Sequence, residues 1–147
     1  EVPSRGLGDV YKRQALTYLW QAVANYVLER KIDILFGVAS FHGTDVSELA
    51  EPLSLLHYHY LAEESLRPVA KKPFNQKMNL LKPDEIDRKL AVLKMPALIK
   101  SYLRLGGKVG LDAYVDHQFN TTDVCLVMDT SVISNKKKSF FVQGELK

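Results

Sequence analysis

The segment from Pro96 to Asp129 constrains the fold most, because it sets an amphipathic helix, a polar elbow and an apolar strand in direct succession. The helix is predicted to begin at Pro96 and to end at Gly106–Gly107, where glycine can adopt the left-handed cap conformation. The apolar run Asp123–Met128 predicts a buried strand. Between them, Val109–Val115 is expected to be a strand interrupted at Gly110.

The rest of the chain alternates helical and extended patterns. We expect helices over Ala15–Arg30, with a broad buried face, over Val46–Leu61 and over Asp84–Lys94. Nearly every position of Ile32–Phe41 is apolar, which predicts a central strand covered on both faces. Arg67–Ala70 is short enough for an edge strand, and Lys71–Lys82 reads as a loop. Such alternation predicts an α/β or α+β fold with a mixed sheet and flanking helices.

Length and composition indicate one globular domain. The 147 residues can bury a core, and 46% hydrophobic and 25% charged residues are average values. No apolar run reaches the roughly 18 to 20 residues of a membrane-spanning helix. The single cysteine, Cys125, lies in an apolar run and is expected to be a buried side chain rather than a nucleophile. One cysteine fits a reducing cytoplasm, which we take as the expected location.

Motif searches exclude several classes of site. The four histidines have no zinc-ligand spacing, so no metal site is expected. Neither a GxSxG elbow nor a Walker loop occurs, and the glycines at 106, 107 and 110 follow a predicted helix rather than a strand. We therefore predict no metal and no bound cofactor.

The first fourteen residues differ from the rest, since they have no helical or alternating apolar pattern. Asp9–Gln14 resembles the in-frame translation of a transposon-end adapter used in sequencing libraries, a contaminant of metagenomic reading frames. We therefore expect residues 1–14 to be a non-native leader and residues 15–147 to form the domain.

Positive charge is concentrated in the middle of the chain. The region Lys71–Lys108 contains ten basic and three acidic residues, a local net charge of +7. Such a region attracts acidic proteins, anionic lipid or nucleic acid. Phe74 is the single aromatic residue near its first lysines, and nucleic-acid binding needs interleaved aromatic residues. We therefore expect no nucleic-acid partner.

The elbow Asp116–Asp123 collects carboxylate, imidazole, amide and hydroxyl groups within eight residues. Polar residues beside a buried strand form either a hydrogen-bonded turn or a ligand site. Residue types alone favour the turn, since Asn, Thr and Asp are common turn formers.

Four blocks, in order, resemble the ornithine–acyl carrier protein N-acyltransferases of bacterial ornithine-lipid synthesis. They are YLWQAVANYVLERKIDILFGVASF with the following GTD, AEPLSLLHYHYLAEESLR (Ala50–Arg67), PALIKSYLRLGGKVG (Pro96–Gly110) and VDHQFNTTDVCLVMD (Val115–Asp129). The resemblance covers most of residues 15–133. It implies the C-terminal part of a GNAT-like acyltransferase fold.

The resemblance also implies a reaction. A 3-hydroxyacyl chain would pass from acyl carrier protein to the α-amine of ornithine, giving a lyso-ornithine lipid. The acidic carrier protein would bind region 71–108, and the enzyme would be cytoplasmic or peripheral on the inner membrane. Because the family's upstream strands and donor loop are missing, we expect this chain alone to be inactive, with one side of the strand at residues 32–41 exposed.

Candidate site residues follow from the resemblance and the chemistry of ornithine. His57, Tyr58 or Tyr60 would give a proton to the leaving thiolate, by analogy with GNAT tyrosines. Asp116 or Asp123 would bind the ornithine ammonium and Arg67 or Arg104 its carboxylate. The elbow residues His117, Asn120 and Thr122 would line the substrate site. For Tyr60 the alternative is core packing, and for Arg104 a solvated charge.

Two other functions remain open at this point. One is acyl transfer to another amino acid or amine. The other is a non-catalytic module that docks on an acidic partner or a membrane through region 71–108.

Overall fold

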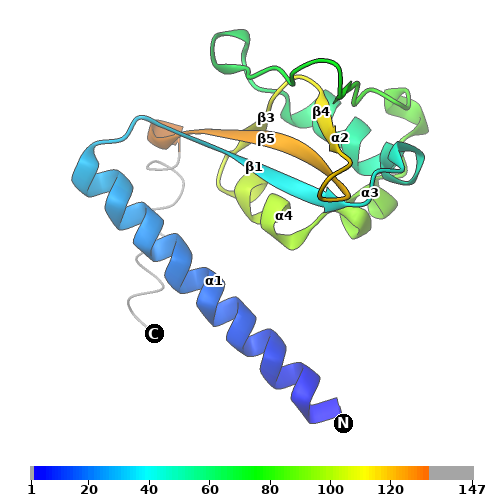
Figure 1. The fold of residues 1–147 in the computed structure, drawn as a ribbon. Coiled ribbons are helices and arrows are strands. Elements are labelled where there is room, and N and C mark those ends of the chain that lie inside the picture. The colour runs from blue at the N-terminus through cyan, green and yellow to red at the C-terminus, as the bar shows by residue number, and fades with distance from the viewer. Residues whose placement is uncertain (1, 133–147) are drawn as a thin grey trace.

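The computed structural model describes residues 2–132 (Figure 1). Its helices are α1 (Val2–Arg30), α2 (Ala50–Tyr60), α3 (Arg88–Lys94) and α4 (Ala97–Arg104), with 3-10 turns at Val46–Leu49, Glu64–Leu66 and Pro83–Glu85. Its strands are β1 (Ile34–His42), β2 (Asn75–Gln76), β3 (Lys108–Val109), β4 (Ala113–Asp116) and β5 (Thr121–Asp129). The predicted α/β class with flanking helices is confirmed. Residues 133–147 of the predicted domain lie outside this description.

The five strands form one sheet with β5 at its centre. The order is β1-β5-β4-β2, and β3 pairs with β5 beyond the end of β4. All four strand pairs are antiparallel, and parallel pairing is confined to isolated bridges at Leu61–Val109 and Val69–Leu111. β5 therefore holds the sheet together, as its apolar sequence predicts.

One face of the sheet packs on the helices. Successive strand residues point to opposite faces, and the core face of β5 presents Thr122, Val124, Leu126 and Met128, all buried. Against it pack buried residues of α2, α3 and α4, among them Leu53, Leu56, Ala91 and Ile99. Burying apolar side chains of this size stabilises the fold by about 1.5 to 3 kcal/mol each.

β1 differs from the prediction, because it is an edge strand with one uncovered face. Within residues 2–132, β5 is its only strand neighbour. Ala39 and Phe41 are buried in the core, whereas Phe36 and Val38 on the other face are 79% and 67% exposed. The prediction of a central strand covered on both faces is therefore wrong, since an apolar run does not reveal whether a covering layer exists. The family resemblance, by contrast, implied that one side of this strand is exposed, and the face with Phe36 and Val38 is exposed.

α1 differs in length and in burial. It begins at Val2, so residues 2–14, whose sequence has no helical apolar pattern, continue the helix toward its N-terminal end (Figure 1). Pro3 is tolerated there because the first turn needs no amide donor. The predicted broad buried face is wrong: Trp20 and Val23 are half-buried, while Leu19 and Leu28 are 62% and 72% exposed.

The other helices follow the prediction with shorter bounds. Asp45 caps the 3-10 turn before α2 by accepting from the Ser47 amide, and Gly106 ends α4 with φ of 89°. The predicted helix at 84–94 is a 3-10 turn followed by α3, whose cap is Asp87. Leu93 is 79% exposed, and Ala91 is the residue of α3 that is buried in the core.

Candidate functional site

The elbow forms the turn of the β4–β5 hairpin. Asp116 Oδ1 accepts hydrogen bonds from the amides of Gln118 and Phe119, both at 3.0 Å, so this carboxylate holds the turn. Asn120 adopts the left-handed conformation with φ of 54°, which asparagine tolerates better than most residues. The turn interpretation, which the residue types favoured, is therefore correct for Asp116 and Asn120.

A second set of bonds ties the hairpin to the loop after β1. The Thr122 hydroxyl is fully buried and donates to the Gly43 carbonyl at 2.8 Å, and the Gly43 amide donates to the Asn120 carbonyl at 2.8 Å. Thr122 faces the core, away from the uncovered face. Its hydroxyl is therefore engaged in holding the loop at Gly43.

Asp123 lies on the uncovered face of the sheet. It pairs with Ser40 of β1 and with Tyr114 of β4, and Oδ1 accepts a hydrogen bond of 2.6 Å from the Ser40 hydroxyl. Among the described residues, none forms an ion pair with Asp123 or donates a hydrogen bond to Oδ2. This half-buried carboxylate thus retains an acceptor for an incoming cationic group.

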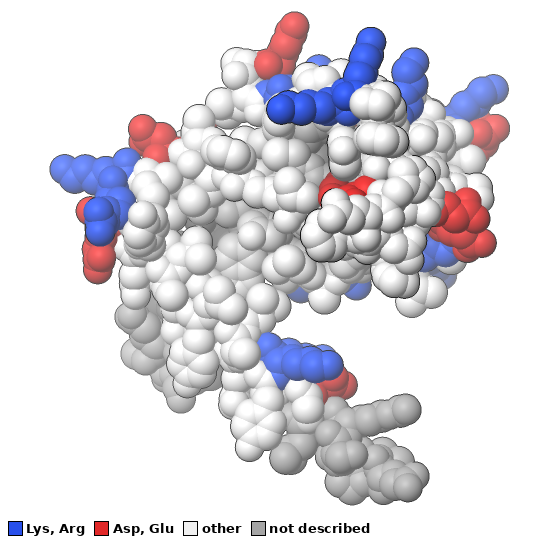
Figure 2. Space-filling view, in the orientation of Figure 1, with Lys and Arg blue, Asp and Glu red and all other residues white. Residues whose placement is uncertain are grey.

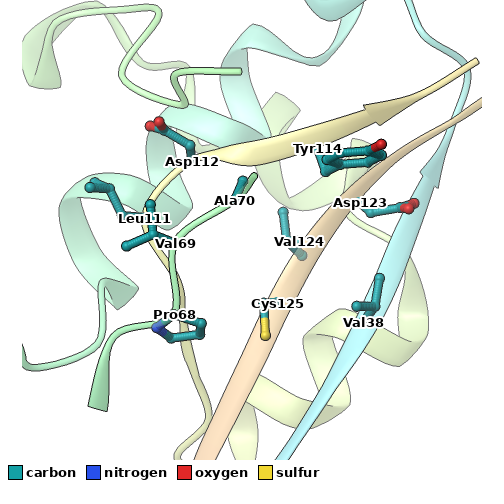
Figure 3. A pocket seen from close by; sticks show the side chains of 10 residues that line it. All are labelled: Val38, Pro68, Val69, Ala70, Leu111, Asp112, Tyr114, Asp123, Val124 and Cys125. Atoms are coloured by element: carbon teal, nitrogen blue, oxygen red, sulfur yellow. The ribbon is translucent and has the colours of Figure 1, made fainter. Parts of the chain in front are cut away.

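Asp123 lines a cavity of about 160 Å³ between β1, β5, β4 and the loop at residues 68–70 (Figure 3). Val38, Tyr114 and Cys125 are among the other lining residues. Figure 3 shows Asp123 beside Tyr114 on one side and the Pro68–Ala70 loop on the other. The cavity therefore combines an apolar wall with the partly engaged carboxylate of Asp123.

Asp112 is the second carboxylate of this cavity. It adopts φ of 65°, and its Oδ2 accepts from the Asn75 side-chain amide at 3.2 Å. Figure 3 shows its carboxylate turned away from that of Asp123. Asp112 therefore holds β2 beside β4 and does not converge with Asp123 on one point.

The loop that closes the cavity is fixed by the backbone. The Leu111 amide donates to the Pro68 carbonyl at 2.8 Å, and the Ala70 amide donates to the Leu111 carbonyl at 3.1 Å. Gly110 permits this contact, because a Cβ at residue 110 would lie 2.6 Å from the Pro68 carbonyl oxygen. The loop contributes bridges rather than the predicted edge strand at 67–70.

Tyr60 and Arg104 lie together, but in the helical layer. Both line a surface cavity of about 220 Å³ formed by α2, α3 and α4. Lys108 Nζ lies 5.7 Å from the centre of the Tyr60 ring, and Tyr60 packs against the core. Asp123 points from the opposite face of the sheet, so these residues do not share its cavity.

The other candidates occupy separate positions. His57 and Tyr58 are in edge-to-face contact at 5.0 Å on α2, and His57 Nδ1 is buried without a hydrogen-bond partner among the described residues. Arg67 Nε donates to the Ala62 carbonyl at 2.8 Å, which fixes the chain after α2. His117 is exposed in the turn, 5.8 Å from the Phe74 ring.

Cys125 is half-buried in the cavity wall, and burial raises the pKa of its thiol. A raised pKa lowers the thiolate fraction at neutral pH and so disfavours nucleophilic attack. Cys125 therefore acts as an apolar wall residue, as its sequence context predicts.

The structure thus separates the predicted site residues into groups. Asp123 lines the cavity, Asp116, His117 and Asn120 lie in or beside the turn, and Thr122 holds the loop after β1. The α2 residues and both arginines lie elsewhere. Sequence analysis missed Ser40 and Asp112. Alternation along β1 could have placed Ser40 on the uncovered face, but its pairing with Asp123, 83 residues away, needs the strand register.

Basic residues of region 71–108 are on the surface. Of its ten Lys and Arg side chains nine are exposed, and Lys100 is half-buried. Figure 2 shows basic side chains along the upper margin, while the face crossed by β1 and β5 is largely uncharged. Within the described part of the chain no three metal-ligating side chains gather, and no helix has the length and apolarity to cross a bilayer.

Sequence comparison gives named relatives. A Rhodobacter capsulatus protein is 54% identical over 88% of this chain, and proteins from Brucella abortus and Agrobacterium fabrum are each 36% identical over 88% and 92%. All three are named L-ornithine N(alpha)-acyltransferase. The chain spans about half the length of these relatives, 49%, 46% and 46% respectively.

No family model and no solved structure matches the chain. The likeness to known proteins therefore rests on sequence similarity to these named relatives. The resemblance drawn from the four sequence blocks is confirmed: over 88% or more of its length the chain is similar to proteins named L-ornithine N(alpha)-acyltransferase, and it spans about half of each.

Proposed function

We propose that this chain is the acceptor-binding part of an N-acyltransferase that acylates the α-amine of ornithine. The observation that carries the proposal is the 54% identity to a protein of that name. The cavity at Asp123 supports it, since a carboxylate in an apolar wall suits a flexible cationic side chain. With half of the relatives' length unaccounted for, the reaction belongs to the longer protein rather than to this chain alone.

Asp123 would bind the side-chain ammonium of ornithine. Its carboxylate is held by Ser40 and retains Oδ2, so an ammonium could bind without displacing a protein donor. Asp116, the other predicted candidate, is engaged by two amides of the turn. The geometry therefore favours Asp123 over Asp116 for this role.

The proposed reaction is attack of a neutral amine on a thioester. The nitrogen forms a bond to the acyl carbon, the carbon–sulfur bond breaks, and the amine proton is finally taken up by the thiolate. The reaction needs a base and donors to the tetrahedral oxyanion. Tyr60 and Arg104 lie on the opposite face of the sheet from Asp123, so this proposal assigns them no contact with an ornithine bound there. Roles for His57 and Tyr58 in protonating the thiolate, and for Arg67 in binding the ornithine carboxylate, stay predictions.

The proposed donor is 3-hydroxyacyl carrier protein, with no bound cofactor. The exposed basic residues of region 71–108 support this choice, because carrier proteins are acidic. The same charges would draw the protein to an anionic inner-membrane surface, where a lipid product could be released. A cytoplasmic, membrane-peripheral location is part of this proposal.

The test uses a chimera in which this chain replaces the matched half of the Rhodobacter capsulatus relative. The chimera is supplied with 3-hydroxyacyl carrier protein or the matching acyl-coenzyme A, and with ornithine, lysine, 2,4-diaminobutyrate or an alkylamine. We expect acylation of ornithine at the α-amine, at least tenfold faster than of the other amines. Preference for another amine would overturn the acceptor assignment, and no transfer to any would overturn the enzymatic one.

The alternative function is a non-catalytic docking module. The exposed cationic region alone favours it. A chimera that binds carrier protein with salt-sensitive affinity but transfers no acyl group would support this alternative.

A further inference from the structure

Among the described residues, one hydrogen-bonding edge of β1 is unpaired along its whole length. Its nine residues pair with β5 on one side, from Ile34–Asp129 to His42–Thr121. Within residues 2–132 no strand lies on the other side. An unpaired edge of this length presents a row of amide and carbonyl groups that can add a further strand.

The uncovered face beside this edge is apolar. Ile34, Phe36 and Val38 are 41%, 79% and 67% exposed and follow one another on the same face of β1. Figure 2 shows that few charged side chains lie on the face crossed by β1 and β5. A contiguous apolar surface of this kind marks an interface rather than a solvated face.

β1 lacks the features that keep edge strands apart. Its sequence, ILFGVASFH, contains no Lys, Arg, Asp, Glu or Pro. Natural edge strands usually carry charges, proline or a bulge that prevent pairing with another strand. The sequence of β1 is therefore that of an inner strand, although its position is at the edge.

The relatives indicate what could cover β1. The match to the Rhodobacter capsulatus protein spans 49% of the length of that protein, so slightly more than half of it lies outside the match. A further portion of that size can provide both a strand for the edge and a layer for the apolar face. The two unpartnered features lie side by side on β1, so one partner can satisfy both.

We propose that β1, through its free edge and the side chains of Ile34, Phe36 and Val38, docks the portion of the longer relatives that this chain does not match. The occupant adds a strand to the sheet beside β1 and covers the face that contains Asp123. This inference concerns assembly and does not require the proposed acyl transfer.

Co-expression provides the test. This chain is expressed with the unmatched portion of the Rhodobacter capsulatus relative as a separate, tagged polypeptide, and the eluate is sized by chromatography with light scattering. We expect a one-to-one complex. Phe36→Lys should reduce the recovered complex at least tenfold, because a charge would then face the buried layer. Leu93→Lys is the matched control, since Leu93 on α3 is equally exposed at 79% and should leave recovery unchanged.

Hydrogen exchange gives a second, independent measurement. Outward amides of residues 34–42 should exchange at least tenfold more slowly in the complex, while those of β5, already paired on both sides, should change little. Circular dichroism of the two free variants checks that both fold.

Three results would overturn the proposal. They are the absence of any complex, equal recovery with Phe36→Lys and Leu93→Lys, and exchange of β1 amides that is unaffected by the partner. A self-associated form of this chain that Phe36→Lys disperses, but that the unmatched portion does not displace, would assign the edge to a second copy instead.

Discussion

At the scale of single residues, three hydroxyl groups join segments that are distant in sequence. Ser40 binds Asp123, Thr122 binds Gly43, and Ser54 binds the loop after β2. Their partners lie 83, 79 and 24 residues away. The sequence shows that these residues are polar, but a polar residue in an apolar context does not reveal its partner. This is why sequence analysis identified Asp123 but not Ser40.

Ser54 gives the clearest prediction at this scale. It is fully buried on α2, donates to the Met78 carbonyl at 3.2 Å and accepts from the Leu81 amide at 2.9 Å. Ser54→Ala leaves both backbone groups without this partner, so the free energy of unfolding should fall by about 1 to 3 kcal/mol. Ser101→Ala, which removes a hydroxyl bonded within α4, should change it by less than about 0.5 kcal/mol. Urea unfolding measures both, and equal effects would refute the role of Ser54.

At the scale of elements, local sequence signals predicted where helices and strands begin and end better than they predicted which elements are buried. The end of a helix at Gly106, the interruption of a strand at Gly110 and the apolar run of β5 were predicted from local chemistry and are confirmed. The burial of β1 and of α1 was predicted wrongly, because burial depends on which other elements are present. β1 has an inner strand's sequence at a sheet edge, and α1 is mostly exposed.

Gly110 connects these elements to the cavity, and its substitution tests that connection. A Cβ at residue 110 would lie 2.6 Å from the Pro68 carbonyl oxygen and 3.1 Å from Pro68 Cγ. Gly110→Ala should therefore lower the free energy of unfolding by about 1 to 3 kcal/mol by forcing the loop at 68–70 away. At Gly37 in β1 a Cβ meets nothing within 4 Å, so Gly37→Ala should be neutral or stabilise by up to about 1 kcal/mol. Similar thermal unfolding of the two variants would contradict this account.

At the scale of the whole molecule, helices cover one face of the sheet, and the other face is open among the residues 2–132 that the structure describes. The core lies between β5 and the helices α2, α3 and α4, whereas Asp123 and the exposed apolar residues of β1 occupy the open face. Resemblance identified the family and the elbow from sequence, but the elbow proved to be mostly a turn. Of the elbow residues, Asp123 alone lines the cavity, because strand alternation places it on the open face.

The most direct test of this account is the acceptor kinetics of the chimera described above. Asp123→Asn should raise the KM for ornithine by about 10- to 100-fold, because a hydrogen bond between charged groups contributes about 1.5 to 3 kcal/mol. The KM for the acyl donor should stay within about twofold, since the proposal assigns this carboxylate to the acceptor alone.

Asp116→Asn is the matched control, because asparagine can keep the turn bonds to Gln118 and Phe119. The account predicts an unchanged ornithine KM for Asp116→Asn and a large rise for Asp123→Asn. An ornithine KM that is unchanged in Asp123→Asn, or raised equally in both variants, would contradict the assignment of Asp123 to the acceptor site.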